Sequence, residues 1–174
     1  MTQPAKSKRL KYPSQKVLKQ LFDYHVGGYL SWKKTGQVAG TSKGRYFIVE
    51  INGVGYQLHV LIFIFWNGYR PVQVDHRDRN SHNNRFENLR PCTQSQNNAN
   101  TKLYKNNGSG FRGVSWFAPD KKWVARIRIN SRCFTLGYFK TKEQAAIVYN
   151  LAAKKAFGVF AALNQIGATC GKQA

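Results

Sequence analysis

The chain has 174 residues, enough for one ordinary domain or two small ones, and its hydrophobic fraction of 42% argues against wholesale disorder. Lys and Arg number 28 against 7 for Asp and Glu, which gives a formal net charge of +21 and a pI near 10.3. Such an excess of positive charge repels itself in the folded state, and a polyanionic partner relieves that repulsion. Nucleic acid is the usual partner of this kind, and a membrane surface is the alternative.

The membrane alternative has little support in the sequence. The most apolar run, VLIFIFW at residues 60–66, is far too short to span a bilayer. No apolar segment follows the early lysines, so no secretory signal is visible. The three cysteines, Cys92, Cys133 and Cys170, form no CxxC pair, which indicates neither a disulfide framework nor a zinc knuckle. We therefore expect a reduced, cytoplasmic protein with no membrane partner.

The positive charge is unevenly distributed along the chain. Residues 1–74 and 108–174 each hold eleven basic and two acidic residues, whereas residues 75–107 hold six basic and three acidic ones. This distribution suggests two basic surfaces that bind a polyanion, on either side of a centre that needs its carboxylates for another purpose.

The first part of the chain predicts a basic arm followed by small helices and strands. Residues 1–16 are rich in Lys and aperiodic, as in a mobile arm, and a short helix is expected over residues 16–24. The apolar run at 59–66 predicts a buried helix that ends at Asn67–Gly68. Three strand-like pieces lie between the two helices, at residues 28–33, 45–51 and 55–58, with Asn52–Gly53 as a hairpin turn.

The segment VDHRDRNSHNNRFENLRPCTQSQNN at residues 74–98 predicts a strand, a loop, a second strand and a helix. Asp75 and His76 end the first strand, where successive side chains point to opposite faces. The Asn- and Asp-rich loop that follows suits tight turns. Thr93 and Gln96 fit a capping box, so Asn97 is expected in the first or second turn of the helix.

The residue types in this segment suit metal-dependent hydrolysis of a phosphodiester. That reaction needs oxygen ligands for a hard divalent ion, a base that is neutral near pH 7, and a rigid frame that holds both. Asp75 offers a carboxylate and His76 an imidazole, and on opposite sides of a strand they can serve different tasks. An Asp-His pair alone often occurs by chance. The prediction of a nuclease site therefore depends mainly on the loop and helix that follow the pair.

The whole segment resembles the HNH (ββα-metal) nuclease motif, in the variant found in phage and group I intron homing endonucleases. The resemblance implies that Asp75 and Asn97 bind one metal ion and that His76 is the general base. It also implies that Asn88 bonds the loop backbone and keeps the His76 ring oriented. The family more often carries His where Asn97 stands here, and a set of Asp and Asn oxygens favours Mg²⁺ or Mn²⁺ over Zn²⁺.

Two further histidines have weaker claims to a role in the chemistry. His82 lies in the polar loop and is expected to be solvated. His59 opens the apolar helix, where a structural or supporting role is favoured over direct chemistry. The sequence assigns a catalytic part to neither.

The last third of the chain predicts a small sheet and one helix. Residues 101–110, TKLYKNNGSG, are polar and aperiodic, as in a linker. Three strands follow, FRGVSWF, KWVARIRI and CFTLGYF, and then a helix over residues 141–157 with Thr141 as its N-cap. The inward stripe of this helix is expected to consist of Ala145, Val148, Tyr149, Ala152 and Ala156.

The central strand, KWVARIRI, alternates between an apolar and a basic face. Trp123, Ala125, Ile127 and Ile129 would face the helix, and the opposite face carries Arg126 and Arg128. Arginine matches guanine edges or phosphate oxygens, and a sheet can enter the DNA major groove. We expect Arg112, Trp116 and Arg132 to join this DNA-binding surface from neighbouring strands. The alternative is an ordinary solvated face.

Residues 111–164 resemble the DNA-binding domain of plant Apetala-two/ethylene-response factors. The resemblance rests on RGV at 112–114, WVARIR at 123–128, LGYF at 136–139 and the helix pattern EQAA, with a terminal LN. It implies a three-stranded antiparallel sheet that packs on one helix and lies in the major groove. Ser115 and Trp116 stand where plant members carry arginines, which implies that a different base sequence is read.

We therefore expect an α+β protein in two parts. Residues 1–100 form a basic, β-rich module with the ββα-metal centre at 72–100, and a linker at 101–110 leads to the Apetala-type domain at 111–164 and a tail at 165–174. The expected function is that of a monomeric, site-specific homing endonuclease that nicks double-stranded DNA, in the bacterial cytoplasm if a phage encodes it. Deletion of residues 108–174 should then leave weak, unspecific nicking. The alternatives are a DNA-binding regulator with an inactive centre and, with less support, an RNA-binding protein.

Overall fold

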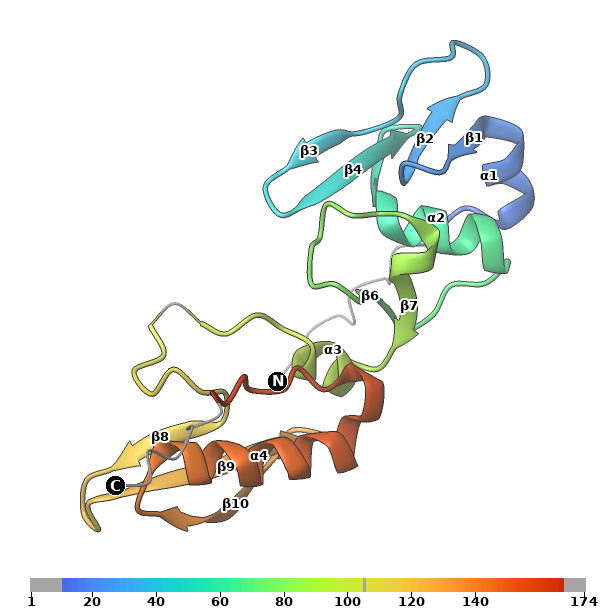
Figure 1. Cartoon of the computed structure of the whole chain (residues 1–174). Coiled ribbons are helices and arrows are strands. Elements are labelled where there is room, and N and C mark those ends of the chain that lie inside the picture. Colours follow the sequence, from blue (N-terminus) through green and yellow to red (C-terminus); the bar gives the residue numbers. More distant parts are fainter. Residues whose placement is uncertain (1–10, 105, 168–174) are drawn as a thin grey trace, which may run out of the picture. The chain divides into compact units, whose positions relative to one another are not determined.

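The computed structural model describes residues 11–104 and 106–167 and divides the chain into two compact units, Met1–Cys92 and Thr93–Ala174 (Figure 1). Both units combine helices with small antiparallel sheets, so the expected α+β class is confirmed. The basic arm expected at 1–16 and the tail expected at 165–174, with Cys170, lie largely outside the described residues. Within the described residues no helix is long and apolar enough to cross a membrane.

The first unit is built around α2 (Leu58–Asn67), in which every residue from 58 to 65 is buried. A helix that is apolar on all sides has to be surrounded by the rest of the unit. It ends at Gly68, whose φ of 78° is the left-handed conformation that glycine adopts without a Cβ clash. The side-chain amide of Gln15, in α1 (Gln15–Leu21), donates to the carbonyls of Phe65 at 3.0 Å and Trp66 at 3.2 Å. The predicted buried helix is thus confirmed.

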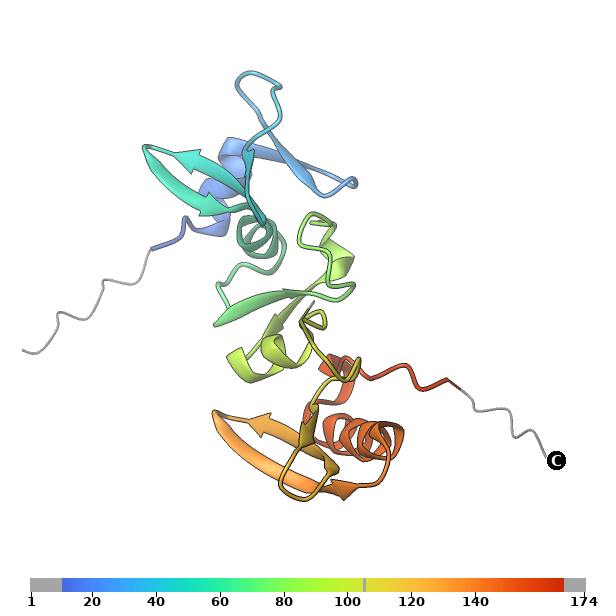
Figure 2. The same cartoon turned by 90° about the vertical axis from the view of Figure 1, so that its left-hand side faces the viewer.

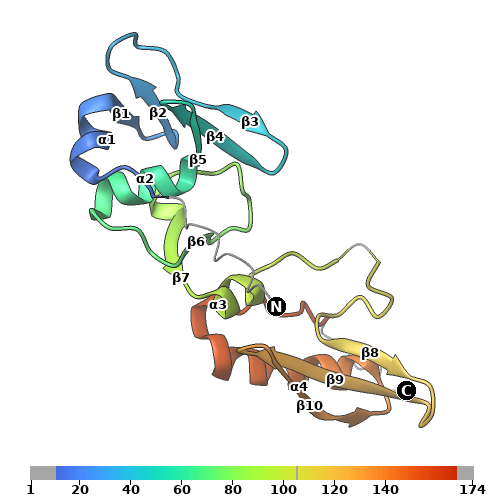
Figure 3. The ribbon, with the colours of Figure 1, turned by 180° about the vertical axis from the view of Figure 1, so that it is seen from behind.

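Two small sheets of the first unit precede α2. β1 (Phe22–His25) and β2 (Tyr29–Trp32) form a hairpin, and β3 (Thr41–Lys43), β4 (Tyr46–Ile51) and β5 (Val54–Gln57) form a three-stranded antiparallel sheet in chain order (Figure 3). Asn52 and Gly53 make the β4–β5 turn with φ values of 50° and 74°, as predicted.

The first helix is shorter than the sequence indicates. It ends at Leu21, and Phe22, expected inside the helix, begins β1 and is fully buried. The backbone N–H of Lys33 donates to the carbonyl of Leu21 at 2.9 Å, and Phe22 pairs with Trp32. Strand pairing with β2 therefore overrides the local helical periodicity.

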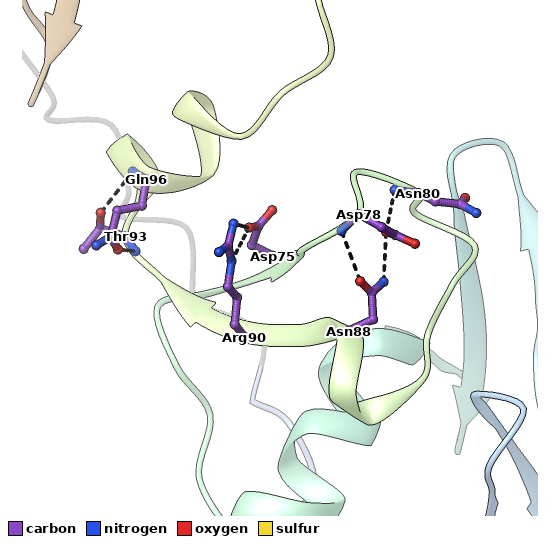
Figure 4. Close-up of polar contacts among 7 residues, drawn as sticks. All are labelled: Asp75, Asp78, Asn80, Asn88, Arg90, Thr93 and Gln96. Atoms are coloured by element: carbon purple, nitrogen blue, oxygen red, sulfur yellow. Dashed lines mark hydrogen bonds and ion pairs between the residues drawn. The ribbon is translucent and has the colours of Figure 1, made fainter. Parts of the chain in front are cut away.

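The elements predicted for residues 72–100 are all present. β6 (Gln73–His76) and β7 (Leu89–Cys92) form an antiparallel hairpin, and a short 3-10 helix, η1 (Phe86–Asn88), precedes β7. α3 (Gln94–Ala99) begins the second unit. Thr93 and Gln96 form the predicted capping box, with N–H···O distances of 3.2 Å and 2.9 Å (Figure 4).

The second unit contains the predicted sheet and helix. β8 (Val114–Phe117), β9 (Lys122–Ile129) and β10 (Arg132–Phe139) form an antiparallel sheet with β9 in the centre. α4 (Lys142–Phe157) packs along one face of this sheet (Figure 2), and η2 (Gly158–Phe160) follows it. Thr141 caps α4 through a second capping box, as expected for its N-cap position.

The buried stripe of α4 differs from the predicted one in its second half. Ala145 and Tyr149 are buried as expected, but Ala156 is exposed, and Ala153 and Phe157 are buried in its place. These positions continue the row at four-residue spacing, which keeps one line of side chains against the sheet along the whole helix. Val148 and Ala152 lie half-buried at its edge.

α3 is fastened to the second unit by packing and hydrogen bonds. Ala99 belongs to a buried cluster with Ile127, Tyr149 and Phe157, and its carbonyl accepts the backbone N–H of Ala162 at 3.1 Å. At the other end of α3, the Ser95 hydroxyl accepts the backbone N–H of Asn130 at 3.2 Å. The sheet and α4 therefore hold this six-residue helix in place.

The polar stretch before the sheet is also bonded to it. Ser109 is buried, and its hydroxyl lies 2.8 Å from the carbonyl oxygen of Val114 and 2.9 Å from that of Phe111. Gly113 has a φ of +71°, and a Cβ there would lie 2.2 Å from the Tyr149 ring, so only glycine allows this close approach. The domain boundaries expected at residues 100 and 111 stay a prediction.

Candidate functional site

Asp75 lies near the end of β6 and is paired with an arginine that the sequence analysis did not single out. In the β6–β7 register Asp75 stands opposite Arg90, and both are only 5% exposed. The Nε and Nη2 atoms of Arg90 each lie 2.8 Å from Asp75 Oδ2 (Figure 4). A buried charge needs such a partner, and the partner also fixes the orientation of the carboxylate. Metal-binding carboxylates are commonly held in this way.

His76, the last residue of β6, is buried, and its Nε2 atom makes a hydrogen bond within the β6–β7 loop. Its Nε2 lies 3.0 Å from Oδ1 of Asn84, which is itself 2% exposed. An amide oxygen only accepts hydrogen bonds, so Nε2 carries the proton, and in the neutral ring Nδ1 carries the lone pair. Burial lowers the pKa of His76, although the Asn84 hydrogen bond and the charge of Asp78 oppose this shift. A neutral imidazole near pH 7 suits a general base.

His59 lies against His76 from α2. The two ring centroids are 5.0 Å apart, and the Tyr46 ring lies 5.2 Å from His59. Burial, and then the charge of His76, lowers the pKa of His59 to about 3, so its ring is neutral in the folded protein at neutral pH. His82 is exposed in the loop, where its ring meets Phe47 edge-on at 5.3 Å.

Asn88 ties the loop between β6 and β7. Its Oδ1 accepts the backbone N–H of Asp78 at 3.1 Å, and its Nδ2 donates to Asp78 Oδ1 at 2.9 Å (Figure 4). The same Nδ2 also donates to the carbonyl of Asn83 at 2.8 Å. Burial raises the pKa of Asp78, but hydrogen bonds from this loop outweigh it and the net shift is downward. The Oδ1 atom of Asn84 accepts a hydrogen bond from His76 Nε2, and sequence reasoning missed Asn84 among the many asparagines of the loop.

Asn97 lies on α3 in the second unit, half-buried, and its backbone N–H donates to the carbonyl of Thr93 at 3.0 Å. Asp75 and His76 are adjacent in the first unit. Across residues 11–104 and 106–167 no cluster of three or more His, Cys, Asp or Glu side chains could hold a metal ion. A magnesium site needs no such cluster, because Mg²⁺ usually takes one or two carboxylates and fills its shell with water and phosphate oxygens.

Residues 56–99, from β5 through α3, match the family of HNH endonucleases. Because of this similarity, we refer to residues 56–99 as the HNH motif. It contains Asp75, His76, Asn84, Asn88 and Asn97. HNH endonucleases are phosphodiester hydrolases.

Two viral relatives extend the comparison. A protein of Acanthamoeba polyphaga mimivirus, named as an uncharacterized HNH endonuclease, is 38% identical over 113 residues, which cover 63% of this chain and 58% of that protein. Protein 3.8 of Escherichia phage T7 is 34% identical over 71 residues, which cover 40% of this chain and 59% of that protein. The chain therefore spans less than two thirds of the length of each. No solved structure matches it.

Cys92 lies at the end of β7, within the HNH motif, and is a buried free thiol. Burial, reinforced by the charge of Asp75, raises the pKa of Cys92 to about 12. In the metal-free protein the thiol therefore stays protonated at neutral pH. Cys133 is also a free thiol, and it is exposed.

Outside the HNH motif, the sheet of the second unit exposes the two predicted arginines. Ala125 and Ile127 are buried on the α4 side, and Arg126 and Arg128 are exposed on the other, as the alternation of β9 predicts. By the same alternation Val124 belongs to the face of these arginines, but it is only 1% exposed. It stands opposite Tyr138 in the register, so the two side chains share one face of the sheet.

The structure does not bring the other three predicted DNA-binding residues to that face. Trp116 stands opposite Trp123 in the register, with their rings 5.2 Å apart, and Arg132 stands opposite Ile129. Residues opposite each other on neighbouring strands share a face, so Trp116 and Arg132 belong to the face of the apolar residues.

Arg112 makes bonds inside the second unit. Its guanidinium donates to the hydroxyl oxygen of Thr101 at 3.2 Å and also to the Thr101 carbonyl. Its backbone N–H donates to Asn164 Oδ1 at 2.6 Å, and its carbonyl accepts from Asn164 Nδ2 at 3.1 Å. These bonds connect Arg112, just before β8, to Thr101 and Asn164, so its role in the second unit is structural.

Proposed function

We propose that the chain is a metal-dependent DNA endonuclease that hydrolyses a phosphodiester, with His76 as the general base. The observation that carries this proposal is the state of the His76 ring. It is buried and bonded at Nε2 to Asn84, so its lone pair lies on Nδ1, and it stands beside the paired carboxylate of Asp75 within the HNH motif. A positioned base of this kind contributes about 10²- to 10⁴-fold to a rate.

Asp75 and Asn97 are the proposed metal ligands. Their carboxylate and amide oxygens are hard donors, which suit Mg²⁺ or Mn²⁺ better than Zn²⁺. The pairing of Asp75 with Arg90 supports this role, because it holds the carboxylate in one orientation. When bound, the ion supplies charge that neutralises the scissile phosphate and the leaving 3′ oxygen.

The other proposed roles in the reaction belong to His76, Arg90 and Asn88. His76 Nδ1 takes the proton of the attacking water, and Arg90 keeps Asp75 in place. Asn88 holds the loop closed by bonding Asp78 and the Asn83 carbonyl. One such centre per chain cuts one strand per binding event, so a monomer nicks duplex DNA.

Arg126 and Arg128 are the proposed DNA-reading residues, in a domain of the Apetala-two type at residues 111–164. Their exposure on one face of β9 supports this role, because the sheet can present both to base edges or phosphates in a major groove. A site-specific homing endonuclease of a phage, acting in the bacterial cytoplasm, is the biological role that we infer, and the phage origin of one relative favours it.

Nicking of a supercoiled plasmid tests the enzymatic proposal. The plasmid should carry the DNA that flanks the protein's own gene, and a cleavage map on that DNA would locate the target. With Mg²⁺ the wild type should produce open circles, and His76→Ala should be slower by about 10²- to 10⁴-fold. His82→Ala, an exposed histidine of the same loop, is the matched control and should nick at the wild-type rate.

The rival proposal is a DNA-binding regulator with an inactive centre. It gains support if wild type and His76→Ala bind this plasmid equally and leave it equally intact, and the nuclease proposal then fails. Competition between duplex DNA and RNA at several salt concentrations separates both proposals from an RNA-binding role.

A further inference from the structure

We propose that Asn84 is the positioning residue of the base, and that the β1–β2 hairpin fixes Asn84 through the loop backbone. Asn84 holds the His76 ring with its proton on Nε2, so that the lone pair that takes a proton from the attacking water lies on Nδ1. The catalytic consequence rests on the proposed nuclease function, whereas the ring state itself does not.

The contact between the two side chains is specific for one state of the ring. Asn84 Oδ1 lies 3.0 Å from His76 Nε2, and both residues are less than a tenth exposed. The Asn84 amide nitrogen points to the carbonyl of His82 at 3.4 Å, which keeps the oxygen turned towards the ring. A proton on Nδ1 alone would leave two acceptors facing each other at this buried contact, so the arrangement selects the Nε2–H form.

The backbone that carries Asn84 is held by a hairpin from a distant part of the sequence. Gly28, in the β1–β2 turn, has a φ of +84°, and a Cβ there would lie 2.4 Å from Arg85 N and 2.6 Å from Asn84 C. The Tyr24 hydroxyl oxygen accepts the backbone N–H of Phe86 at 3.0 Å. The hairpin therefore contacts the loop backbone at Asn84 and again at Phe86. These two contacts fix the position of the Asn84 backbone.

Asn88 secures the same loop from its other end. It donates to the carbonyl of Asn83, the residue before Asn84, at 2.8 Å. The HNH resemblance implies that Asn88 keeps the His76 ring oriented. Asn88 would do so indirectly, by holding Asn83 and thereby the neighbouring Asn84. On α2 the His59 ring lies 5.0 Å from the His76 ring, so a second element of the first unit also borders the base.

Ring spectroscopy on the full chain tests the proposal without any need for turnover. In ¹⁵N-labelled, metal-free wild type at pH 7.5, long-range ¹H–¹⁵N correlations of His76 should show a protonated Nε2 and an unprotonated Nδ1. Asn84→Asp keeps an acceptor at this position and should keep that pattern, whereas Asn84→Leu should give a mixture of both ring forms. A wild-type ring with its proton on Nδ1 would overturn the proposal, whether or not the variants fold.

Nicking at saturating DNA measures the consequence for the reaction. Asn84→Leu should lower the rate at saturation by at least about tenfold with little change in DNA affinity, and Asn84→Asp should restore most of it. Asn52→Asp, an equal charge change in the exposed β4–β5 turn, is the control and should leave the rate unaltered.

The outcomes separate this proposal from the nuclease function. An unchanged ring form and unchanged rate in folded Asn84→Leu would refute the role of Asn84 while the nuclease proposal stands. The wild type could instead show the expected protonated Nε2 and still fail to nick DNA. That result would support Asn84 as the residue that selects the ring form of His76, and it would refute the nuclease function.

Discussion

The β6–β7 hairpin and the β8–β10 sheet differ in the burial of their charged side chains. In the hairpin Asp75, His76 and Arg90 are almost fully buried, and each has a close hydrogen-bond partner. In the sheet Arg126 and Arg128 are exposed, and neither guanidinium makes a hydrogen bond or ion pair with the described part of the chain. Chemistry needs groups with fixed directions in a dry frame, whereas recognition of a polyanion needs charges that remain available to it.

The largest expected effect comes from removing the sheet altogether. α3, which carries Asn97, packs through Ala99 against Ile127 and Tyr149, and a six-residue helix is not stable alone. Deletion of residues 108–174 should therefore abolish nicking, whereas the sequence alone predicts weak residual nicking. Plasmid nicking by the truncated chain is the measurement, and cutting that survives truncation would show that α3 needs no support from the sheet.

Next in size is the buried ion pair of the hairpin. Arg90→Ala leaves the Asp75 carboxylate buried without its arginine, which should lower the free energy of unfolding by about 3–5 kcal/mol. Arg126→Ala, at an exposed arginine of the sheet, should change it by no more than about 0.5 kcal/mol. Urea denaturation of the two variants beside wild type measures both values. Equal losses would remove the contrast between the two regions.

A smaller effect is expected for DNA binding by the sheet. Arg128→Ala should cost about 1–3 kcal/mol of binding free energy, and the dependence of affinity on salt should become shallower if the contact is to phosphate. Arg112→Ala should instead lower stability, because its guanidinium bonds Thr101. Fluorescence anisotropy at several salt concentrations, with thermal unfolding in parallel, separates the two. Loss of affinity at unchanged stability in the Arg112 variant would contradict this assignment.

The smallest effect is the pH dependence that His59 contributes. Its pKa of about 3 in the folded protein lies below the ordinary value of 6.5, so between these values the unfolded chain binds the extra proton. The stabilisation is complete above pH 6.5 and is lost as the pH falls towards 3. Between pH 7.5 and pH 5.5 the free energy of unfolding should fall by about 1 kcal/mol from this group.

Urea denaturation of variants at the two pH values isolates that contribution. His59→Leu should show a smaller fall than wild type, whereas His82→Leu, at the exposed loop histidine, should show the same fall as wild type. An unaltered fall in the His59 variant would mean that this ring does not stay neutral in the folded protein.

The sequence by itself determined the features that depend on neighbouring residues. Periodicity predicts α2 and the two faces of β9, and residue preferences predict the Asn52–Gly53 turn, the capping box at Thr93 and the N-cap at Thr141. The HNH motif is likewise a local pattern, so Asp75, His76 and Asn97 stand out as candidates from the order of the residues alone.

Only the tertiary structure decided which side chains meet. Arg90 pairs with Asp75 because of the β6–β7 register. Asn84, whose backbone lies close to Gly28 of the β1–β2 turn, contacts the His76 ring. Arg112 turns inward to Thr101, and Phe22 leaves the predicted helix to pair with β2. Each of these outcomes depends on contacts between segments far apart in the chain or on strand register, and a local pattern contains neither.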